Sequence, residues 1–268
     1  RKNRIVILTT KEKNQPVTNT WSSKAAMPTA RYNLGTTTVN DKVYAIGGHD
    51  GFSFFDTNEE YDPATNTWSS KATMPTARYS LGITTVNGKV YAIGGRDYTT
   101  GRLATNEEYD PVTNTWSSKA AMPTARYALG TTTVNGKVYA IGGHDDSSYL
   151  DTNEEYDPVT NTWSSKAAMP TARRYFGTTA VNDKVYAIGG HDGNSFFDTN
   201  EEYDPATNTW LARAEMPTAR YTFSATAVNG KVYAIGGFDD IRLLSTNEEY
   251  TPPSIQGLDA LKSWLAAV

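Results

Sequence analysis

The sequence predicts an all-β protein that is built from repeated four-stranded units. The first observation is an Asn-Thr-Trp triplet that recurs at a spacing of 47 or 48 residues, with its tryptophan at Trp21, Trp68, Trp116, Trp163 and Trp210. The second is a β-branched run, a two-residue turn and an apolar run ending in Gly-Gly, which occurs once in each unit. The third is that no unit carries apolar residues at helical spacing. A fixed period of this length indicates a repeat architecture.

The third complete unit illustrates the expected order of the strands. They are predicted at residues 130–134, 137–141, 153–156 and 162–165. Asn135-Gly136 separates the first two, and this pair tolerates the positive φ angles of a type I′ hairpin turn. Asp157-Pro158 separates the last two. The paired glycines suit a bend or a close backbone approach. Short four-stranded sheets at a regular period favour a β-propeller, in which each sheet is one blade.

Four motifs recur in the same order in most units. They are Val-Tyr-Ala-Ile-Gly-Gly, Asn-Glu-Glu-Tyr, Asn-Thr-Trp and Met-Pro-Thr-Ala-Arg. Together they resemble the kelch repeat, over about nine-tenths of the chain. The resemblance implies that the first strand of each blade is innermost. It also implies that Tyr139, Tyr156, Trp163 and their counterparts pack between blades, which agrees with the large contribution of aromatic side chains to core energetics.

The termini are expected to close the ring. We expect one domain over residues 1–268 with six blades, the sixth being built from both termini. Residues 3–10 align with a second strand, residues 20–23 carry an intact fourth strand, and residues 263–268 would supply the first strand. The alternative is a five-bladed ring, closed by residues 20–23. In that case the divergent closing segment, residues 254–268, is a helix, because its apolar residues have helical spacing.

Composition excludes several classes of function. The net charge of −4 argues against a general nucleic-acid binder, and no apolar run approaches the ~18 residues of a membrane span. The chain has no cysteine, which excludes disulfides and thiolate ligands and leaves the compartment unknown. No serine-hydrolase, phosphate-loop or zinc-protease motif occurs. We therefore expect no catalytic residue, metal or cofactor.

The copies differ from one another mainly in two places. One is the loop after each Gly-Gly pair, and the other is the short segment that opens each first strand. The kelch resemblance implies that both lie at one rim of the central opening, and loops on a rigid scaffold often carry binding residues. The candidate ligand-binding residues are Arg31, Tyr32, His49, Arg78, Tyr79, Arg96, Arg126, Tyr127, His144, Arg173, Arg174, Tyr175, His191, Arg220, Tyr221 and Phe238.

This composition of the rim predicts a non-catalytic scaffold that binds a protein or peptide, with acidic segments as the favoured ligands. Arginine forks match carboxylates, and Tyr and Arg are enriched at binding hot spots. Three alternatives remain. The repeated arginines can instead be structural partners of the Glu pairs, in which case Arg96 and Arg174, which break the repeat, are the best ligand contacts. The chain can be a carbohydrate-binding or enzymatic propeller with a central pocket. It can also be an engineered or recently duplicated scaffold without an evolved ligand.

Three histidines at equivalent positions, His49, His144 and His191, raise the question of a metal site. Equivalent positions on different blades are spread around the axis, so they are not expected to converge on one ion. We expect polar loop residues instead, each followed by an Asp that turns the chain.

Overall fold

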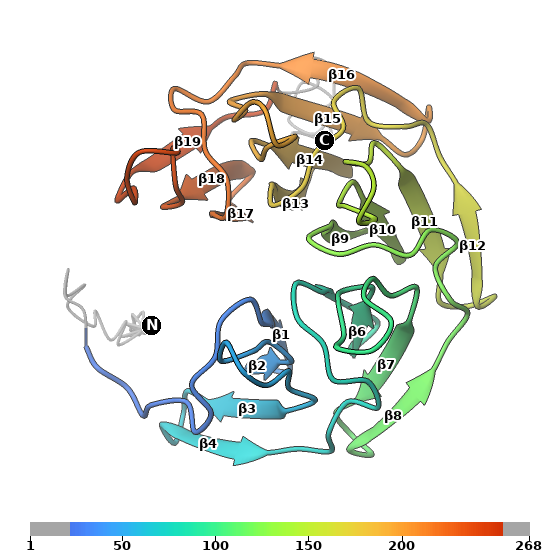
Figure 1. Cartoon of the computed structure of the whole chain (residues 1–268), viewed down its shortest axis with the longest axis vertical. Coiled ribbons are helices and arrows are strands. Elements are labelled where there is room, and N and C mark those ends of the chain that lie inside the picture. Colours follow the sequence, from blue (N-terminus) through green and yellow to red (C-terminus); the bar gives the residue numbers. More distant parts are fainter. Residues whose placement is uncertain (1–21, 254–268) are drawn as a thin grey trace, which may run out of the picture.

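The computed structural model describes residues 22–253, which form five β-sheets arranged side by side around one axis (Figure 1). Four of the sheets have four antiparallel strands in chain order, and the fifth has three. The first strand of each sheet lies nearest the axis, and the last lies at the periphery. Each sheet is therefore one blade of a propeller, as the sequence predicts. No helix of residues 22–253 is long and apolar enough to cross a membrane.

The nineteen described strands divide evenly among the blades, except in the last one. The blades comprise β1 (Gly35–Val39), β2 (Lys42–Ile46), β3 (Asn58–Asp62) and β4 (Thr67–Ser70); β5 (Gly82–Val86), β6 (Lys89–Ile93), β7 (Asn106–Asp110) and β8 (Thr115–Ser118); β9 (Gly130–Val134), β10 (Lys137–Ile141), β11 (Asn153–Asp157) and β12 (Thr162–Ser165); β13 (Gly177–Val181), β14 (Lys184–Ile188), β15 (Asn200–Asp204) and β16 (Thr209–Arg213); and β17 (Ser224–Val228), β18 (Lys231–Ile235) and β19 (Asn247–Tyr250).

The expectation of six blades is wrong, because the structure has five. The residue set that makes a blade consists of the Gly-Gly pair, the Arg and Glu of the repeat, and the third-strand Tyr, and it occurs in five copies. Residues 3–10, which align with a second strand, carry none of the glycines. The strands or helix expected at residues 3–10, 20–21 and 254–268 lie outside the described residues. Ser22 and Ser23 are described and are not part of a strand.

The turns between the first two strands have the predicted geometry. Asn135 and Gly136 have φ angles of 50° and 74°, as a type I′ turn requires at both central positions. Asn40 and Asp41, the non-glycine version of the same turn, have φ angles of 51° and 60°. The hairpin registers follow from these turns, with Val134 opposite Lys137 in the third blade.

Aromatic side chains pack between neighbouring blades, as the kelch resemblance implies. The ring of Tyr139 in β10 lies 5.7 Å from that of Tyr203 in the next blade. Within the third blade, Tyr156 and Trp163 lie 5.1 Å apart. The indole N–H of Trp163 donates to the carbonyl of Ala120, in the linker before that blade, at 2.8 Å. Each contact is repeated with little change from blade to blade.

The Gly-Gly pair allows the close approach between blades. Gly142 has a φ of 57°, and a Cβ atom there would lie 2.7 Å from the ring of Phe176 and 2.8 Å from the carbonyl of Arg173. The turn glycine Gly136 has a φ of 74° and no atom within 4 Å of such a Cβ. The two glycines therefore share a left-handed backbone and differ in the space around them.

We expect Gly142→Ala to be more destabilising than Gly136→Ala. Gly136→Ala carries only the cost of a left-handed non-glycine residue, about 1–2 kcal/mol. Gly142→Ala adds a clash with the backbone of the next blade, so its cost should exceed that of the control. Urea unfolding of both variants measures the difference, and equal midpoints would contradict this account of the Gly-Gly pair.

Candidate functional site

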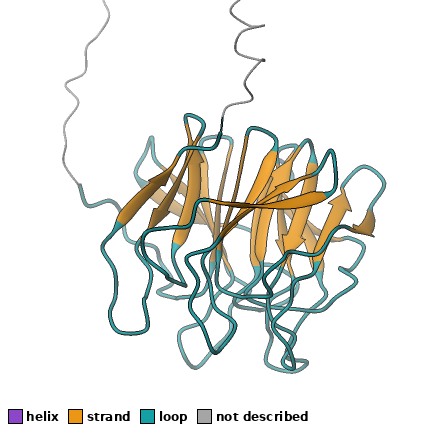
Figure 2. Cartoon of the chain, turned by 90° about the horizontal axis from the view of Figure 1, so that it is seen from above, coloured by secondary structure: helices purple, strands orange, loops and turns teal. Residues whose placement is uncertain are grey.

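A short ladder extends each blade beyond its sheet at one face of the propeller. The residue after each Gly-Gly pair forms two isolated antiparallel β-bridges. One is to the residue that follows the arginine of the Thr-Ala-Arg motif, which lies in the linker before the blade and is called the linker arginine. The other is to a residue of the loop that follows the Gly-Gly pair. These sets are Tyr32, His49 and Phe54; Tyr79, Arg96 and Arg102; Tyr127, His144 and Tyr149; Arg174, His191 and Phe196; and Tyr221, Phe238 and Leu243. We call these residues the rim. The longer loops gather at one face of the molecule (Figure 2).

A chain of backbone hydrogen bonds joins the blades beside the rim. The N–H of Ser80 donates to the carbonyl of Asn33 at 2.9 Å, and the N–H of Ala128 donates to Ser80 at 2.8 Å. Tyr175 and Thr222 continue the series at 3.1 and 2.9 Å. All five residues have φ between 49° and 53°, which is uncommon for residues other than glycine. The shared conformation aligns their backbone groups across five blades and holds the rim residues in a fixed arrangement.

The repeated arginines do not lie on the rim. Their side chains are fully buried, and each pairs with the first glutamate of its blade. The pairs are Arg31–Glu59, Arg78–Glu107, Arg126–Glu154, Arg173–Glu201 and Arg220–Glu248, at 2.5–2.8 Å. The assignment of these five arginines to the ligand-binding set is therefore corrected. The structural alternative holds for them, because a guanidinium that is removed from solvent cannot contact a ligand at the rim.

Arg126 shows how such a pair joins two blades. Its guanidinium donates to Glu154 Oε2 at 2.7 Å and to the carbonyl of Ala140 at 2.8 Å, both in the third blade. Its own carbonyl accepts from the N–H of Gly95, in the second blade, at 3.0 Å. Burial lowers the pKa of Arg78, its counterpart in the second blade, to about 10. That value is far enough above neutrality for the buried guanidinium to stay charged.

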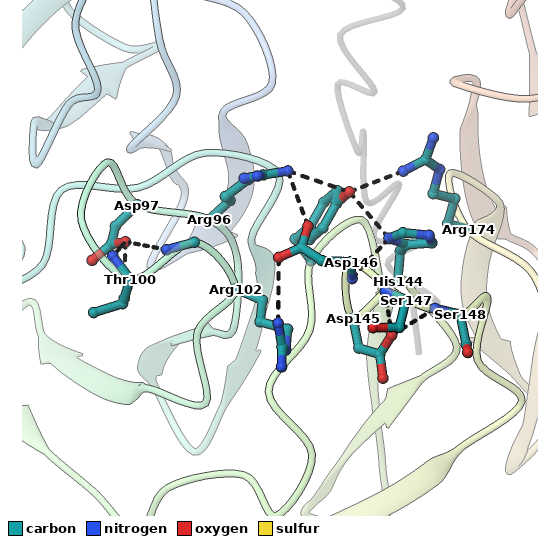
Figure 3. Close-up of polar contacts among 12 residues, drawn as sticks. Arg96, Asp97, Thr100, Arg102, His144, Asp145, Asp146, Ser147, Ser148 and Arg174 are labelled. Atoms are coloured by element: carbon teal, nitrogen blue, oxygen red, sulfur yellow. Dashed lines mark hydrogen bonds and ion pairs between the residues drawn. The ribbon is translucent and has the colours of Figure 1, made fainter.

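Two arginines outside the repeat converge at the rim (Figure 3). Arg174 donates to the hydroxyl oxygen of Tyr127 at 3.1 Å, and Arg96 approaches the same oxygen at 3.5 Å. His144 Nδ1 lies 3.1 Å from that hydroxyl. Asp146 pairs with Arg96 at 3.1 Å. We call Arg96, Tyr127, His144, Asp146 and Arg174 the rim cluster.

The rim cluster itself contains two arginines and one aspartate. Asp146 is shared, because Arg102 also reaches it at 3.5 Å. Arg174 pairs with no carboxylate among residues 22–253. Its guanidinium lies instead over the rings of Tyr149 and Tyr175, at 5.2 Å from each centroid. An arginine held by aromatic faces keeps its charge available to an anion while its position is fixed.

Exposed aromatic side chains adjoin the rim cluster on the second blade and its neighbour. The ring centroids of Tyr79 and Phe54 lie 4.7 Å apart, and those of Phe54 and Tyr98 lie 5.6 Å apart. Tyr98 is 83% exposed. Tyr32 of the first blade is 52% exposed. These rings provide apolar contact area next to the charged groups.

The pKa values of the rim histidines are lowered, mainly by burial. Burial lowers the pKa of His191, and the nearby charge of Arg174 lowers it further. Burial and Arg174 also lower the pKa of His144. His49, His144 and His191 lie on three different blades. Within residues 22–253, no three side chains of His, Asp or Glu come together in a way that could hold a metal ion.

The rim residue that directly follows each Gly-Gly pair is itself followed by an aspartate, which turns the chain as expected. Asp145 Oδ1 accepts the backbone N–H groups of Ser147 and Ser148 at 2.9 and 2.7 Å. These hydrogen bonds lower the pKa of Asp145. The sequence prediction did not include Asp146, Tyr149 or Arg102 in the site. All three lie in the variable loops that it identified, but which loop residue turns toward the neighbouring blade depends on the fold.

Comparisons with known proteins agree with this architecture. A sequence model of the KLHDC2/KLHL20/DRC7 Kelch-repeats domain matches residues 71–237, and a model of the kelch motif matches residues 30–75. The chain belongs to the kelch-repeat family. Membership in this family supports a protein-binding scaffold in general. No curated protein matches the chain significantly. A structure titled "Structure of YjhT" is similar to this kelch propeller, with a TM-score of 0.77 and 17% identity over 88% of this chain and 86% of that one.

Removing one buried carboxylate should test the structural role of the repeated arginines. Glu154→Ala leaves Arg126 buried without its partner, and we expect a loss of about 3–5 kcal/mol in the free energy of unfolding. Lys137→Ala is the control, because it removes only the surface pair with Asp157, with an expected loss below about 1 kcal/mol. Urea unfolding measures both. Similar losses in the two variants would contradict the prediction, because the buried arginine pair would then stabilise the fold no more than a surface pair does.

The lowered pKa values of the rim histidines should make stability depend on pH. The pKa of His191 is lower in the folded protein than its usual value of about 6.5. The unfolded chain therefore binds more protons as the pH falls through about 6.5, and stability should decrease in that direction. His191→Gln should reduce this dependence. Urea midpoints measured over the range from about pH 7.5 to 5 test the prediction, which fails if the variant and the parent have the same pH slope.

Proposed function

We propose that this kelch propeller is a non-catalytic scaffold that binds an acidic segment of a partner protein at the rim cluster. The observation that carries the proposal is the guanidinium of Arg174, which pairs with no carboxylate in the described part of the chain and lies beside Arg96 across the hydroxyl of Tyr127. A carboxylate of the partner would accept hydrogen bonds from one or both arginines. Charge-assisted bonds of this kind are about twice as strong as neutral ones.

The surroundings of the rim cluster support a peptide ligand over a lone small anion. Tyr98 and Tyr32 are exposed aromatic residues on neighbouring loops, and such residues are enriched at the centres of protein interfaces. The ligand favoured by this combination is a segment in which an acidic residue is flanked by apolar ones. The rim loops belong to a framework held by hydrogen bonds from blade to blade, so binding requires little ordering of the protein.

The central cavity does not favour the enzymatic alternative. It is lined by glycine, threonine, serine, alanine and apolar residues of the innermost strands and the segments before them, including Thr131, Phe176 and Phe223. No acidic, basic or histidine side chain lines it within the described part of the chain. Acid–base chemistry requires a titratable group within hydrogen-bond reach of the substrate.

Binding should depend on both rim arginines. Arg96→Ala with Arg174→Ala should weaken binding of a synthetic peptide rich in Glu and Phe by roughly 10-fold or more, because each charged hydrogen bond contributes about 1.5–3 kcal/mol. Calorimetric titration at low and moderate salt gives the affinities. The effect should shrink at higher salt, because the two guanidinium groups are only partly buried.

Two controls separate site binding from general charge effects. Lys119→Ala with Lys166→Ala removes the same net charge beside the outer strands β8 and β12, where these lysines pair with Glu108 and Glu155. This variant should bind as the parent does. A peptide with Gln in place of Glu should bind weakly to all variants. Equal affinity of the rim-arginine variant and the parent would refute the proposal.

A further inference from the structure

Three of the five hairpin turns are identical in sequence and in geometry. The ten residues from valine to the Gly-Gly pair are the same at 86–95, 134–143 and 228–237. In all three turns the asparagine has a φ of 50–52° and the glycine a φ of 73–75°, and the asparagine is exposed to solvent. A chemical difference between these turns must therefore come from the blades that carry them.

An exposed Asn-Gly pair is a site of spontaneous deamidation. The backbone nitrogen of the glycine attacks Cγ of the asparagine, the Cγ–Nδ2 bond breaks, and ammonia leaves with the proton of the glycine amide. Water then opens the cyclic imide at either of its two carbonyl carbons. One product has aspartate in place of asparagine, and the other is an isoaspartyl residue, in which the backbone runs through Cγ. Glycine permits the attack because it has no side chain beside the reacting nitrogen.

The folded turn itself holds the reacting atoms apart. The imide ring can close only when the glycine nitrogen swings to the Cβ side of the asparagine Cα–C bond. The positive φ and ψ angles of a type I′ turn keep that nitrogen on the opposite side. Deamidation therefore requires the hairpin to open locally, and its rate follows the free energy of that opening, which differs between parts of one fold.

Burial of the flanking strands protects two of the turns and not the third. The valine before the turn is 5% exposed in the second and third blades, at Val86 and Val134, and 51% exposed in the fifth, at Val228. Ile235, at the end of β18, is 45% exposed, whereas its two counterparts are fully buried. Opening the fifth-blade hairpin therefore exposes less additional apolar surface than opening the other two.

A hydroxyl link between blades also distinguishes the three hairpins. Thr85 bonds through its hydroxyl to Thr37 of the first blade at 2.7 Å, and Thr133 bonds in the same way to Thr84 of the second blade at 2.9 Å. Ala227 stands at the corresponding position of the fifth blade. Alanine has no hydroxyl, so β17 lacks the link that ties the turn ends of β5 and β9 to the preceding blade.

We propose that Asn229 is a selective deamidation site of this protein, and that Asn87 and Asn135 are protected in the folded state. The aspartyl product fits the turn, because Asp-Gly also adopts type I′ geometry. The isoaspartyl product adds one methylene group to the backbone of a two-residue loop, so Val228 and Lys231 can no longer pair in their present register. Each event also adds one negative charge, and the isoaspartyl form loosens the fifth blade as the protein ages.

Peptide mapping of the aged protein tests the proposal. The full chain is incubated in mildly alkaline buffer without denaturant and then digested with trypsin, which places the three asparagines in separate peptides, residues 79–89, 127–137 and 221–231. Mass spectrometry gives the deamidated fraction, and an isoaspartyl methyltransferase labels the isoaspartyl share. Asn229 should react roughly 10-fold or more faster than the other two, because its hairpin loses less apolar burial on opening. Equal rates in the folded chain would overturn the proposal.

The same chain in concentrated urea is the control for intrinsic reactivity. The three turns share their sequence, so the unfolded chain should deamidate at the same rate at all three. A preference for Asn229 that persists in urea would assign it to the neighbouring residues and overturn the structural explanation.

A reciprocal exchange tests the link between blades. Ala227→Thr introduces a hydroxyl at the position that bonds to the preceding blade elsewhere, with Thr179 of the fourth blade as its expected partner, and should slow deamidation of Asn229 in the folded chain. Thr133→Ala removes the existing link and should accelerate deamidation of Asn135. An unchanged rate at Asn229 in the first variant, together with an unchanged rate at Asn135 in the second, would contradict the role given to these hydroxyl groups.

Discussion

Five buried arginine–glutamate pairs hold the blades in register, and the geometry of the rim depends on them. Four of these arginines lie in linkers between two described blades, with the backbone carbonyl accepting from a glycine of one blade and the guanidinium paired in the other: Arg78, Arg126, Arg173 and Arg220. For Arg126 these contacts reach Gly95 on one side and Glu154 on the other. A buried pair is specific because an arginine without its partner would be strongly destabilising. The pairs therefore fix the end of each linker, and with it the position of the rim residue that directly follows the arginine.

The rim results from this constraint and from a run of left-handed residues. Ser80, Ala128 and Tyr175 adopt positive φ and join their blades through consecutive backbone hydrogen bonds. The surrounding sheets hold a backbone conformation that isolated residues rarely adopt. Side chains in the neighbouring positions are therefore free to vary, and Arg174 replaces the tyrosine found in the other four copies. This replacement places a guanidinium over the rings of Tyr149 and Tyr175, where no carboxylate of residues 22–253 pairs with it.

The near-identity of the copies separates structural positions from ligand-binding ones. A residue present in all five blades, such as the linker arginine, repeats because every blade interface has the same packing requirement. Arg96 and Arg174 depart from the pattern, and they meet at one hydroxyl group. The fifth blade, of which the structure describes three strands within residues 22–253, is the other departure.

The amino-acid sequence by itself determined the repeated strands and their hairpin turns, because these follow from local spacing and turn chemistry. Asn135 and Gly136, for example, have the positive φ angles that a type I′ turn requires. The aromatic contacts between blades were expected from the resemblance to the kelch repeat. Only the tertiary structure decided that five blades form and that the linker arginines are buried. Arg126 and Glu154 are 28 residues apart, and whether such residues meet in a core or face solvent depends on packing. The rim cluster also required the fold, since Arg96, Tyr127 and Arg174 come from different repeats and meet only when their blades stand side by side.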